Sequence, residues 1–231
     1  MRQDWRQLLF LHWRVSPELI QKTLPPGLTV DTFAGDAYIG LVPFTMRNVR
    51  PVWSPPVPGL SHFHEINVRT YVQANGEPGV WFYSLDAANP VAVAIARVLF
   101  HLPYYVAAMR LEIANGGGEI SYVSQRRHPG VRNDESVLRY TPVSPVRHAE
   151  PGSLDHFLCE RYLLYSQNGN DLYSGRVHHS PYPLQDAVLH DCSDTLVAAA
   201  GFPGLANGPP VHAAYAEGVS VEVFGLRAVV K

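Results

Sequence analysis

Segments rich in valine, tyrosine, phenylalanine and isoleucine, separated by turns, make up most of this chain of 231 residues. Turns with glycine or asparagine, such as Asn75-Gly76 and residues 115–118, bound several of them, as is typical of β-strands. We expect strands at Tyr38–Val49, Glu65–Gln73, Val80–Leu85, Val106–Ala114, Ile120–Gln125, Val137–Tyr140, Leu172–Val177 and Val219–Val230. Many antiparallel strands with few helices predict a mainly β fold, either a barrel or a sandwich with helical additions.

Helix signals are few. Ser16-Pro17-Glu18 supplies an N-cap, a proline at the first helical position and an acidic residue in the first turn. Pro25-Pro26-Gly27 ends that helix. A third, weaker helix is expected from Leu154 to about Arg161, with Ser153 as its cap.

The second helix start is Asn89-Pro90, which predicts a helix over Val91–Phe100. This segment is apolar nearly all round, apart from Arg97 and His101. A helix of that kind is normally buried. A buried Arg97 would then need a carboxylate or several carbonyl groups, because an unpaired buried charge is costly.

Composition excludes several classes of protein. Only 16% of the residues are charged, while there are 18 glycines and 20 prolines, which argues against a coiled coil and a disordered tail. The net charge of -2 shows no excess of basic residues of the kind that binds nucleic acid or an anionic membrane. The apolar run Leu8–Leu11 is shorter than the ~7–15 residues of a secretory signal, and no stretch approaches the ~18 residues of a membrane span. We therefore expect a cytoplasmic protein in which Cys159 and Cys192 are reduced, packed thiols.

The chain shows no repeat and no low-complexity linker. Its most conspicuous loop is the proline-rich segment Pro51–Gly59, which we expect to be long and exposed. It is too short and too aromatic to separate two domains, so the sequence predicts a single domain over residues 1–231.

Motifs for familiar chemistries are absent. No nucleophile elbow, phosphate-binding glycine loop or dinucleotide fingerprint is present. His62 and His64 have a spacing that could hold a metal, but no third ligand is marked, so structural histidines are favoured. His178-His179 would point to opposite faces of a strand, and His190-Asp191-Cys192 places a base beside a nucleophile that it would rarely face. No metal and no organic cofactor is predicted.

The strand around Glu65 is more informative. Residues Asn67, Arg69, Tyr71 and Gln73 alternate along it and therefore share one face. Polar and aromatic groups on one face either line a barrel interior or cleft, or form a solvated outer surface. The two interpretations stay open at this stage.

Six segments together carry a family resemblance. They are Leu9-Phe10-Leu11-His12-Trp13, Leu24-Pro25-Pro26-Gly27-Leu28, the strand from Glu65 to Val72, Phe82-Tyr83-Ser84-Leu85-Asp86-Ala87, Leu102-Pro103-Tyr104-Tyr105 and His179-Ser180-Pro181-Tyr182-Pro183-Leu184. Over nearly its whole length the chain resembles the uncharacterised bacterial YqjF-like family of the acetoacetate decarboxylase-like superfamily. The resemblance implies an acetoacetate decarboxylase-like antiparallel β-barrel with a few short helices.

The resemblance to acetoacetate decarboxylase itself is more distant and covers roughly the first half. The segment from Pro25 to Asp31 resembles an element of that enzyme, whose active-site arginine and one active-site glutamate fall on Arg6 and Glu65. A second active-site glutamate falls in the apolar segment around Leu41 and Val42. The Pro-Lys-Lys of the enzyme, which supplies the Schiff-base lysine, matches Pro103-Tyr104-Tyr105.

The tyrosines at the two lysine positions decide which chemistry we expect. Schiff-base decarboxylation needs an amine that is neutral near pH 7, and neither Tyr104 nor Tyr105 supplies one. The only lysines are Lys22, on the amphipathic first helix, and Lys231. Acetoacetate decarboxylase activity is therefore not expected, and the resemblance implies an inherited cavity without its nucleophile.

We expect this cavity to bind a small anionic or carbonyl-bearing organic molecule and to perform acid–base chemistry of a lyase or isomerase type. The residues assigned to catalysis are Glu65, Tyr104 and Arg6, and those assigned to ligand binding are Tyr105, Arg69 and Arg97. Two alternatives remain: a non-catalytic binding protein, and a structural or interaction role in which the same charges are simply paired. The low-charge, aromatic composition and the superfamily also favour a homo-oligomer.

Overall fold

The computed structural model describes residues 1–114 and 118–229. Its strands are β1 (Arg2–Val15), β2 (Thr29–Val30), β3 (Ala37–Arg50), β4 (Phe63–Ala74), β5 (Glu77–Ala87), β6 (Tyr104–Ile113), β7 (Ile120–Arg126), β8 (Glu135–Pro142), β9 (Leu163–Asn168), β10 (Asp171–His179), β11 (Leu184–Asp194) and β12 (His212–Ala228). Its helices are α1 (Pro17–Gln21), α2 (Pro90–Phe100), α3 (Leu154–Cys159) and α4 (Leu196–Ala199), with a 3-10 turn at Leu205–Asn207. Most of the expected turn at 115–118, the expected strand end at Val230, and Lys231 lie outside the described residues.

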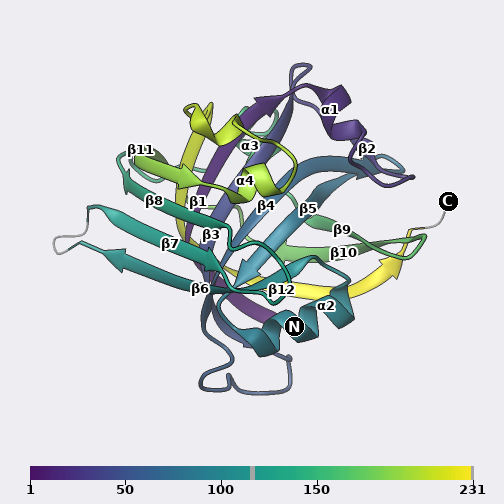
Figure 1. Ribbon diagram of the computed structural model, residues 1–231, viewed down its shortest axis with the longest axis horizontal. Helices are drawn as coiled ribbons and strands as arrows, with labels where there is room; N and C mark the ends of the chain where they lie inside the picture. The colour runs from purple at the N-terminus through teal and green to yellow at the C-terminus, as the bar shows by residue number, and fades with distance from the viewer. Residues whose placement is uncertain (115–117, 230–231) are drawn as a thin grey trace.

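The strands of the described chain form one sheet of mainly antiparallel pairs, in the order β10-β9-β5-β6-β7-β8-β11-β12-β1-β3-β4-β2 (Figure 1). Two further pairings, β4 with β5 and β10 with β12, join strands that are distant in this order and close the sheet on itself. The exceptions to antiparallel pairing are β5 with β6 and β5 with β9. The mainly β fold expected from the sequence is confirmed.

All eight expected strands are present, but β1, β9, β11 and the two-residue β2 were not predicted. Strand β1 pairs with β12 on one side and β3 on the other, so it lies in the interior of the sheet. Leu8 and Phe10 belong to one buried apolar cluster, whereas Leu9 and Leu11 belong to another. A strand that buries both faces has a continuous apolar run instead of alternation, which is why its sequence signal is weak.

The first and third helices begin at the expected caps. The Ser16 side chain accepts a hydrogen bond from the backbone N–H of Leu19, and Ser153 accepts one from His156. The loop expected at Pro51–Gly59 is confirmed: it lies between β3 and β4, holds no helix or strand, and is almost entirely exposed. No helix in the described part of the chain is long and apolar enough to cross a membrane.

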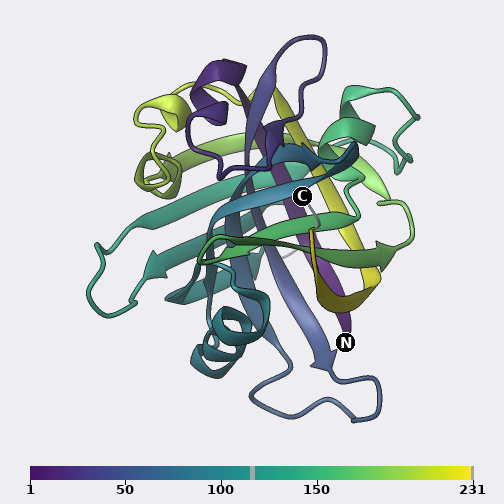
Figure 2. The same cartoon turned by 90° about the vertical axis from the view of Figure 1, so that its right-hand side faces the viewer.

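Helix α2 corrects one expectation, because it lies on the outside of the sheet (Figure 2). Only Val93 is fully buried, and four apolar side chains are 49–70% exposed: Val91, Ile95, Val98 and Leu99. Arg97 is exposed too, and it donates to the backbone carbonyl of Tyr104 at 2.6 Å rather than to a carboxylate. The helix is the crossover between the parallel strands β5 and β6. The sheet covers one side of it, and no second layer of the described chain covers the other.

Candidate functional site

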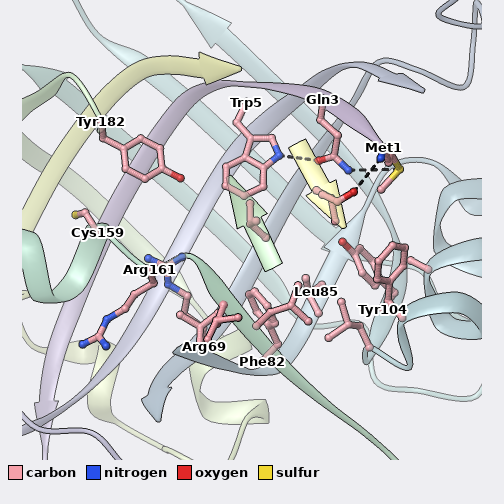
Figure 3. Close-up of a pocket in the computed structure, with 18 residues that line it drawn as sticks. Met1, Gln3, Trp5, Arg69, Phe82, Leu85, Tyr104, Cys159, Arg161 and Tyr182 are labelled. Carbon is pink, nitrogen blue, oxygen red and sulfur yellow. Dashed lines mark hydrogen bonds between the residues drawn. The ribbon is translucent and has the colours of Figure 1, made fainter. Parts of the chain in front are cut away.

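A cavity of about 120 Å³ lies among strands β1, β4, β5, β9, β10 and β12, next to α2 and the end of α3 (Figure 3). Most of its wall is apolar, formed by side chains such as Val80, Phe82, Leu85 and Leu164. Polar groups reach it at few places. Those that matter most for chemistry are the Tyr104 hydroxyl and the Arg69 guanidinium, which approach from different sides with Phe82 and Leu85 between them in the view of Figure 3.

Tyr104 connects the cavity to a buried carboxylic acid. It is the first residue of β6 and lines the cavity, and its hydroxyl donates to Oε2 of Glu65 on β4 at 2.8 Å. Glu65 is only 2% exposed, and desolvation raises its pKa to about 8, with the nearby Asp86 charge adding to the rise. The hydrogen bond from Tyr104 acts in the opposite direction and is the weaker influence. The acid therefore exchanges its proton close to neutral pH.

Burial also raises the pKa of Tyr104, and the negative charge of Glu65 adds to the effect. The backbone of Glu65 is held as well, because the Tyr122 hydroxyl donates to its carbonyl oxygen at 2.8 Å. Tyr104 and Glu65 thus form a fixed hydrogen-bonded pair in which the phenol faces the cavity and the acid lies behind it.

Arg69 on β4 is the second polar group. Its side chain is half-buried, lines the cavity, and donates to the Tyr71 hydroxyl at 3.3 Å and the Leu158 carbonyl at 3.1 Å. Its Nε is buried without a partner. In the described part of the chain no carboxylate lies within 4.0 Å of this guanidinium.

Arg161 also lines the cavity but is compensated differently. Its guanidinium pairs with the Asp31 carboxylate at 2.7 Å and donates to the Phe157 carbonyl at 2.7 Å. The contrast with Arg69 is informative, since one cavity arginine has a protein counter-ion and the other has none among the described residues.

Three residues assigned to this site from the sequence lie elsewhere. Tyr105 follows Tyr104 on β6 and therefore points to the opposite face, where Arg126 stacks on its ring at 4.1 Å. Tyr105 and Arg97 line a separate surface hollow. Arg6 on β1 does not line the cavity; it donates to the carbonyls of Trp5 and Val219. The structure thus brings together Glu65 and Tyr104, places Arg69 on the same cavity, and does not add the other three.

No lysine of the described chain lines the cavity. Lys22 is exposed at the end of α1. Leu41 and Val42, in the segment where the second glutamate of acetoacetate decarboxylase falls, are buried apolar residues. The amine required for a Schiff base is therefore missing from the cavity wall within the described ranges.

The other sequence candidates show ordinary structural contacts. His64 makes a hydrogen bond to the Thr45 hydroxyl, and His62 is exposed and accepts from the backbone N–H of Asn48. Within residues 1–114 and 118–229, no group of three or more metal-ligating side chains is found. Cys159 and Cys192 are free thiols, and Cys159 lines the cavity, where burial raises its pKa.

Sequence reasoning missed several cavity residues. These residues come from three separate parts of the chain, at Trp5, at Cys159 and Arg161, and at Tyr182, and no spacing rule links the three parts. Only Tyr182 lies in a segment that carried the family resemblance. The fold brings Trp5 of β1, the end of α3 and the segment before β11 around one space, so a single sequence holds no local signal for the set.

Comparisons with known proteins agree with this architecture. The uncharacterised protein YqjF of Bacillus subtilis (strain 168) is 40% identical over 230 residues, covering 98% of this chain and 91% of YqjF. The enduracididine biosynthesis enzyme MppR, solved with pyruvate, superposes with a TM-score of 0.62 at 16% identity, covering 98% of this chain and 89% of that one. An acetoacetate decarboxylase-like enzyme from Sphingomonas wittichii RW1 gives 0.64 at 13% identity, covering 99% and 92%.

At these low identities the two solved structures show a shared fold and nothing about substrate. The family profile of DUF2071, described as an uncharacterized conserved protein, matches residues 2–220, which is nearly the whole chain. Together with the identity to YqjF, this match shows that the chain belongs to the DUF2071, YqjF-like family and has the acetoacetate decarboxylase-like fold.

Proposed function

We propose that the cavity binds a small organic acid that also carries a carbonyl or hydroxyl group. Its carboxylate contacts Arg69, and its second oxygen accepts a hydrogen bond from Tyr104 when Glu65 is protonated and donates its own proton to the Tyr104 oxygen. The observation that carries this proposal is the Arg69 guanidinium, which lines the cavity with an unpartnered Nε and, among the described residues, no carboxylate partner.

The positive charge of Arg69 needs a compensating group inside the protein. A buried cation without a counter-ion costs several kcal/mol unless hydrogen bonds or an anion satisfy it. Tyr71 and Leu158 satisfy part of the Arg69 guanidinium through neutral oxygens. A carboxylate matches the planar donors of an arginine and would supply the missing charge.

Size limits the ligand. An apolar cavity of roughly 150 Å³ holds one benzene molecule. The 120 Å³ available here suits a molecule of about six non-hydrogen atoms or fewer. Pyruvate, the ligand in the solved MppR complex, is within that range and serves as the first probe.

The binding test compares pyruvate with pyruvamide, which has nearly the same shape but no charge. Calorimetric titration of the wild-type chain is expected to show binding of pyruvate at least tenfold tighter than pyruvamide. The variant Arg69→Met keeps the unbranched apolar stem of the side chain and removes the charge, so it is expected to lose about 10- to 100-fold in pyruvate affinity. Arg176→Met, on an exposed arginine of β10, is the matched control and is expected to bind as wild type.

Two results would contradict the binding proposal. One is equal affinity for pyruvate and pyruvamide. The other is an Arg69→Met variant that folds, as judged by its circular dichroism and melting curve, and binds pyruvate as tightly as wild type. Either would remove the role assigned to Arg69.

The Glu65–Tyr104 pair favours catalysis over simple binding. When Glu65 is ionised, the Tyr104 oxygen can take a proton from the carbon next to the ligand carbonyl while passing its own proton to Glu65. The C–H electron pair then forms an enolate, and the positive charge of Arg69 stabilises the resulting anion. The reverse transfer returns a proton to carbon, so the net result is isomerisation or hydrogen exchange.

This step predicts a pH dependence. Glu65 must be ionised to accept the proton, and its pKa is raised to about 8. Exchange of the pyruvate methyl protons in D₂O, followed by NMR, is therefore expected to slow about tenfold per pH unit below pH 8 and to level off above it. Glu65→Gln and Tyr104→Phe should each reduce the exchange by 10²-fold or more. Tyr105→Phe, on the opposite face of β6, should have no effect.

The same experiment distinguishes the alternative. Tight pyruvate binding with no exchange above the rate of free pyruvate at any pH would contradict catalysis by this pair. It would identify the chain as a non-catalytic binding protein.

A further inference from the structure

Helix α2 has two apolar sides, and the sheet covers only one of them. On the inner side Val93 packs into the core, while Ala96 and Phe100 line the cavity. Four apolar side chains on the outer side are 49–70% exposed: Val91, Ile95, Val98 and Leu99. They follow one another at steps of four, three and one residues, which places them in a single stripe along the helix. A helix normally packs such a stripe against another element, yet no described part of the chain covers it.

The loop between β3 and β4 extends the same apolar surface. The Asn89 side chain, which caps α2, donates to the carbonyls of Gly59 and Leu60 at 3.2 and 3.1 Å and so ties the loop to the start of the helix. Figure 2 shows the loop and α2 side by side at the lower end of the molecule. Four apolar side chains of the loop are 41–84% exposed: Val52, Trp53, Val57 and Leu60. These four and the four of the helix are named the α2–loop face below.

The α2–loop face is larger than an ordinary apolar surface patch. Multiplied by the full area of each residue type, the exposed fractions give roughly 800 Å² of surface, whereas the largest apolar patch of a typical monomer covers about 300–600 Å². Each partner in a protein–protein interface of standard size buries about 800 Å². The face therefore has the area that a stable dimer needs.

The α2–loop face also carries almost no charge. Residues 51–60 contain no charged side chain, and Arg97 is the only one in α2. Its guanidinium is bound to the Tyr104 carbonyl at 2.6 Å. The centres of protein interfaces are depleted in charged residues, whereas a helix that lies on a membrane is rich in lysine and arginine on its polar face. In a two-fold contact the surface meets its own copy, so a face with few charges avoids like-charge repulsion.

We propose that a second copy of this chain covers the α2–loop face, in a two-fold dimer in which α2 packs against α2. A two-fold axis across the helix near Ile95 makes the pair antiparallel and sets each Ile95 beside the same residue of the other copy. The steps of four and three residues in the stripe suit close packing of two helices. Trp53 and its neighbours widen the contact. Because Ala96 and Phe100 line the cavity, the second copy lies directly behind one cavity wall.

The first test measures the mass of the chain by sedimentation velocity. The wild type at about 10 μM is expected to have twice the mass of one chain. Val98→Lys places a charge at a position that is 70% exposed in the single chain, so it should fold normally and weaken the dimer by about 100-fold or more. Trp53→Ala, in a loop without helix or strand, should weaken it about tenfold or more.

Val188→Lys is the matched control for the charge. Val188 on β11 is an apolar residue that is 45% exposed, and β11 lies on the other side of the molecule from α2 (Figure 1). This variant is expected to remain a dimer as tight as the wild type. Circular dichroism and a melting curve check that all three variants are folded.

A cross-link tests the geometry of the contact. Ile95→Cys, made together with Cys192→Ser to remove the partly exposed thiol, is expected to form a disulfide between two chains on mild oxidation. A disulfide needs Cα atoms about 4.4–6.8 Å apart, which only a contact close to the axis supplies. Val188→Cys in the same background should stay uncross-linked. A dimer in which Ile95→Cys forms no disulfide would overturn the proposed packing of α2 on α2.

Three further results would overturn the proposal. The first is a wild-type chain that is monomeric at about 100 μM. The second is a dimer that Val98→Lys and Trp53→Ala leave as tight as the wild type. The third is a monomer that co-sediments with vesicles of phosphatidylglycerol and phosphatidylcholine, and does so more strongly as Val98→Lys, which would make the face a membrane-binding surface. None of these measurements depends on pyruvate binding.

Discussion

Replacing Asp86 with alanine is expected to destabilise the fold by about 3–5 kcal/mol, because it leaves the buried Arg126 with only its longer contact to Asp134, at 3.6 Å. Asp86 on β5 is fully buried and accepts two hydrogen bonds from Arg126 on β7, at 2.8 and 2.7 Å. The Arg126 side chain is only 7% exposed and lies on the ring of Tyr105. Urea unfolding followed by circular dichroism measures the change.

Two control variants separate burial from charge. Glu77→Ala breaks an exposed pair with Arg176 and is expected to cost less than about 1 kcal/mol. The double variant Asp86→Leu with Arg126→Met removes both charges and leaves Asp134 paired with Arg132 at 3.2 Å, so it should recover much of the loss. A single Asp86→Ala variant as stable as wild type would contradict the structural role given to this pair and to Tyr105.

Replacing Glu65 with glutamine is expected to change how stability depends on pH. The carboxyl group has a pKa of about 8 when folded and about 4.5 when unfolded, so the folded chain holds a proton that the unfolded chain releases. The contribution of Glu65 to the stability of the wild-type chain should therefore be largest below about pH 4.5 and should fall as pH rises to 8. The loss is at most about 5 kcal/mol.

Glutamine does not titrate, so the variant should lack this fall and exceed the wild type in stability above pH 8. The difference between the two unfolding free energies, measured from pH 5 to 9, isolates Glu65, because other titrating groups contribute to both proteins. Glu112→Gln, on an exposed carboxylate, should leave the wild-type slope unchanged. Parallel curves for wild type and Glu65→Gln would show that Glu65 is not buried as described.

The sequence predicted the helix caps and the strands bounded by clear turns. It failed for β1, whose residues Leu8 to Trp13 are buried on both faces and have no alternation. It also misjudged α2, since an apolar helix does not reveal whether its own chain covers it. Two-sided burial and coverage are both tertiary properties, set by partners far away in the sequence.

The same limit explains the outcome at the site. Glu65 and Tyr104 were found through a resemblance, and the structure shows their hydrogen bond. Tyr105 was assigned because Tyr104-Tyr105 match the two lysines of acetoacetate decarboxylase, although neighbours on a strand face opposite sides. What distinguishes Arg69 is that no carboxylate among the described residues pairs with its guanidinium. Only the three-dimensional structure can show that.

A crystal structure of the chain soaked with pyruvate shows directly whether the cavity holds a carboxylate against Arg69. Electron density is expected in the cavity, with the carboxylate within hydrogen-bond distance of Arg69 and the ketone oxygen facing the Tyr104 hydroxyl. An empty cavity at saturating pyruvate, or pyruvate bound there with its carboxylate turned away from Arg69, would contradict it.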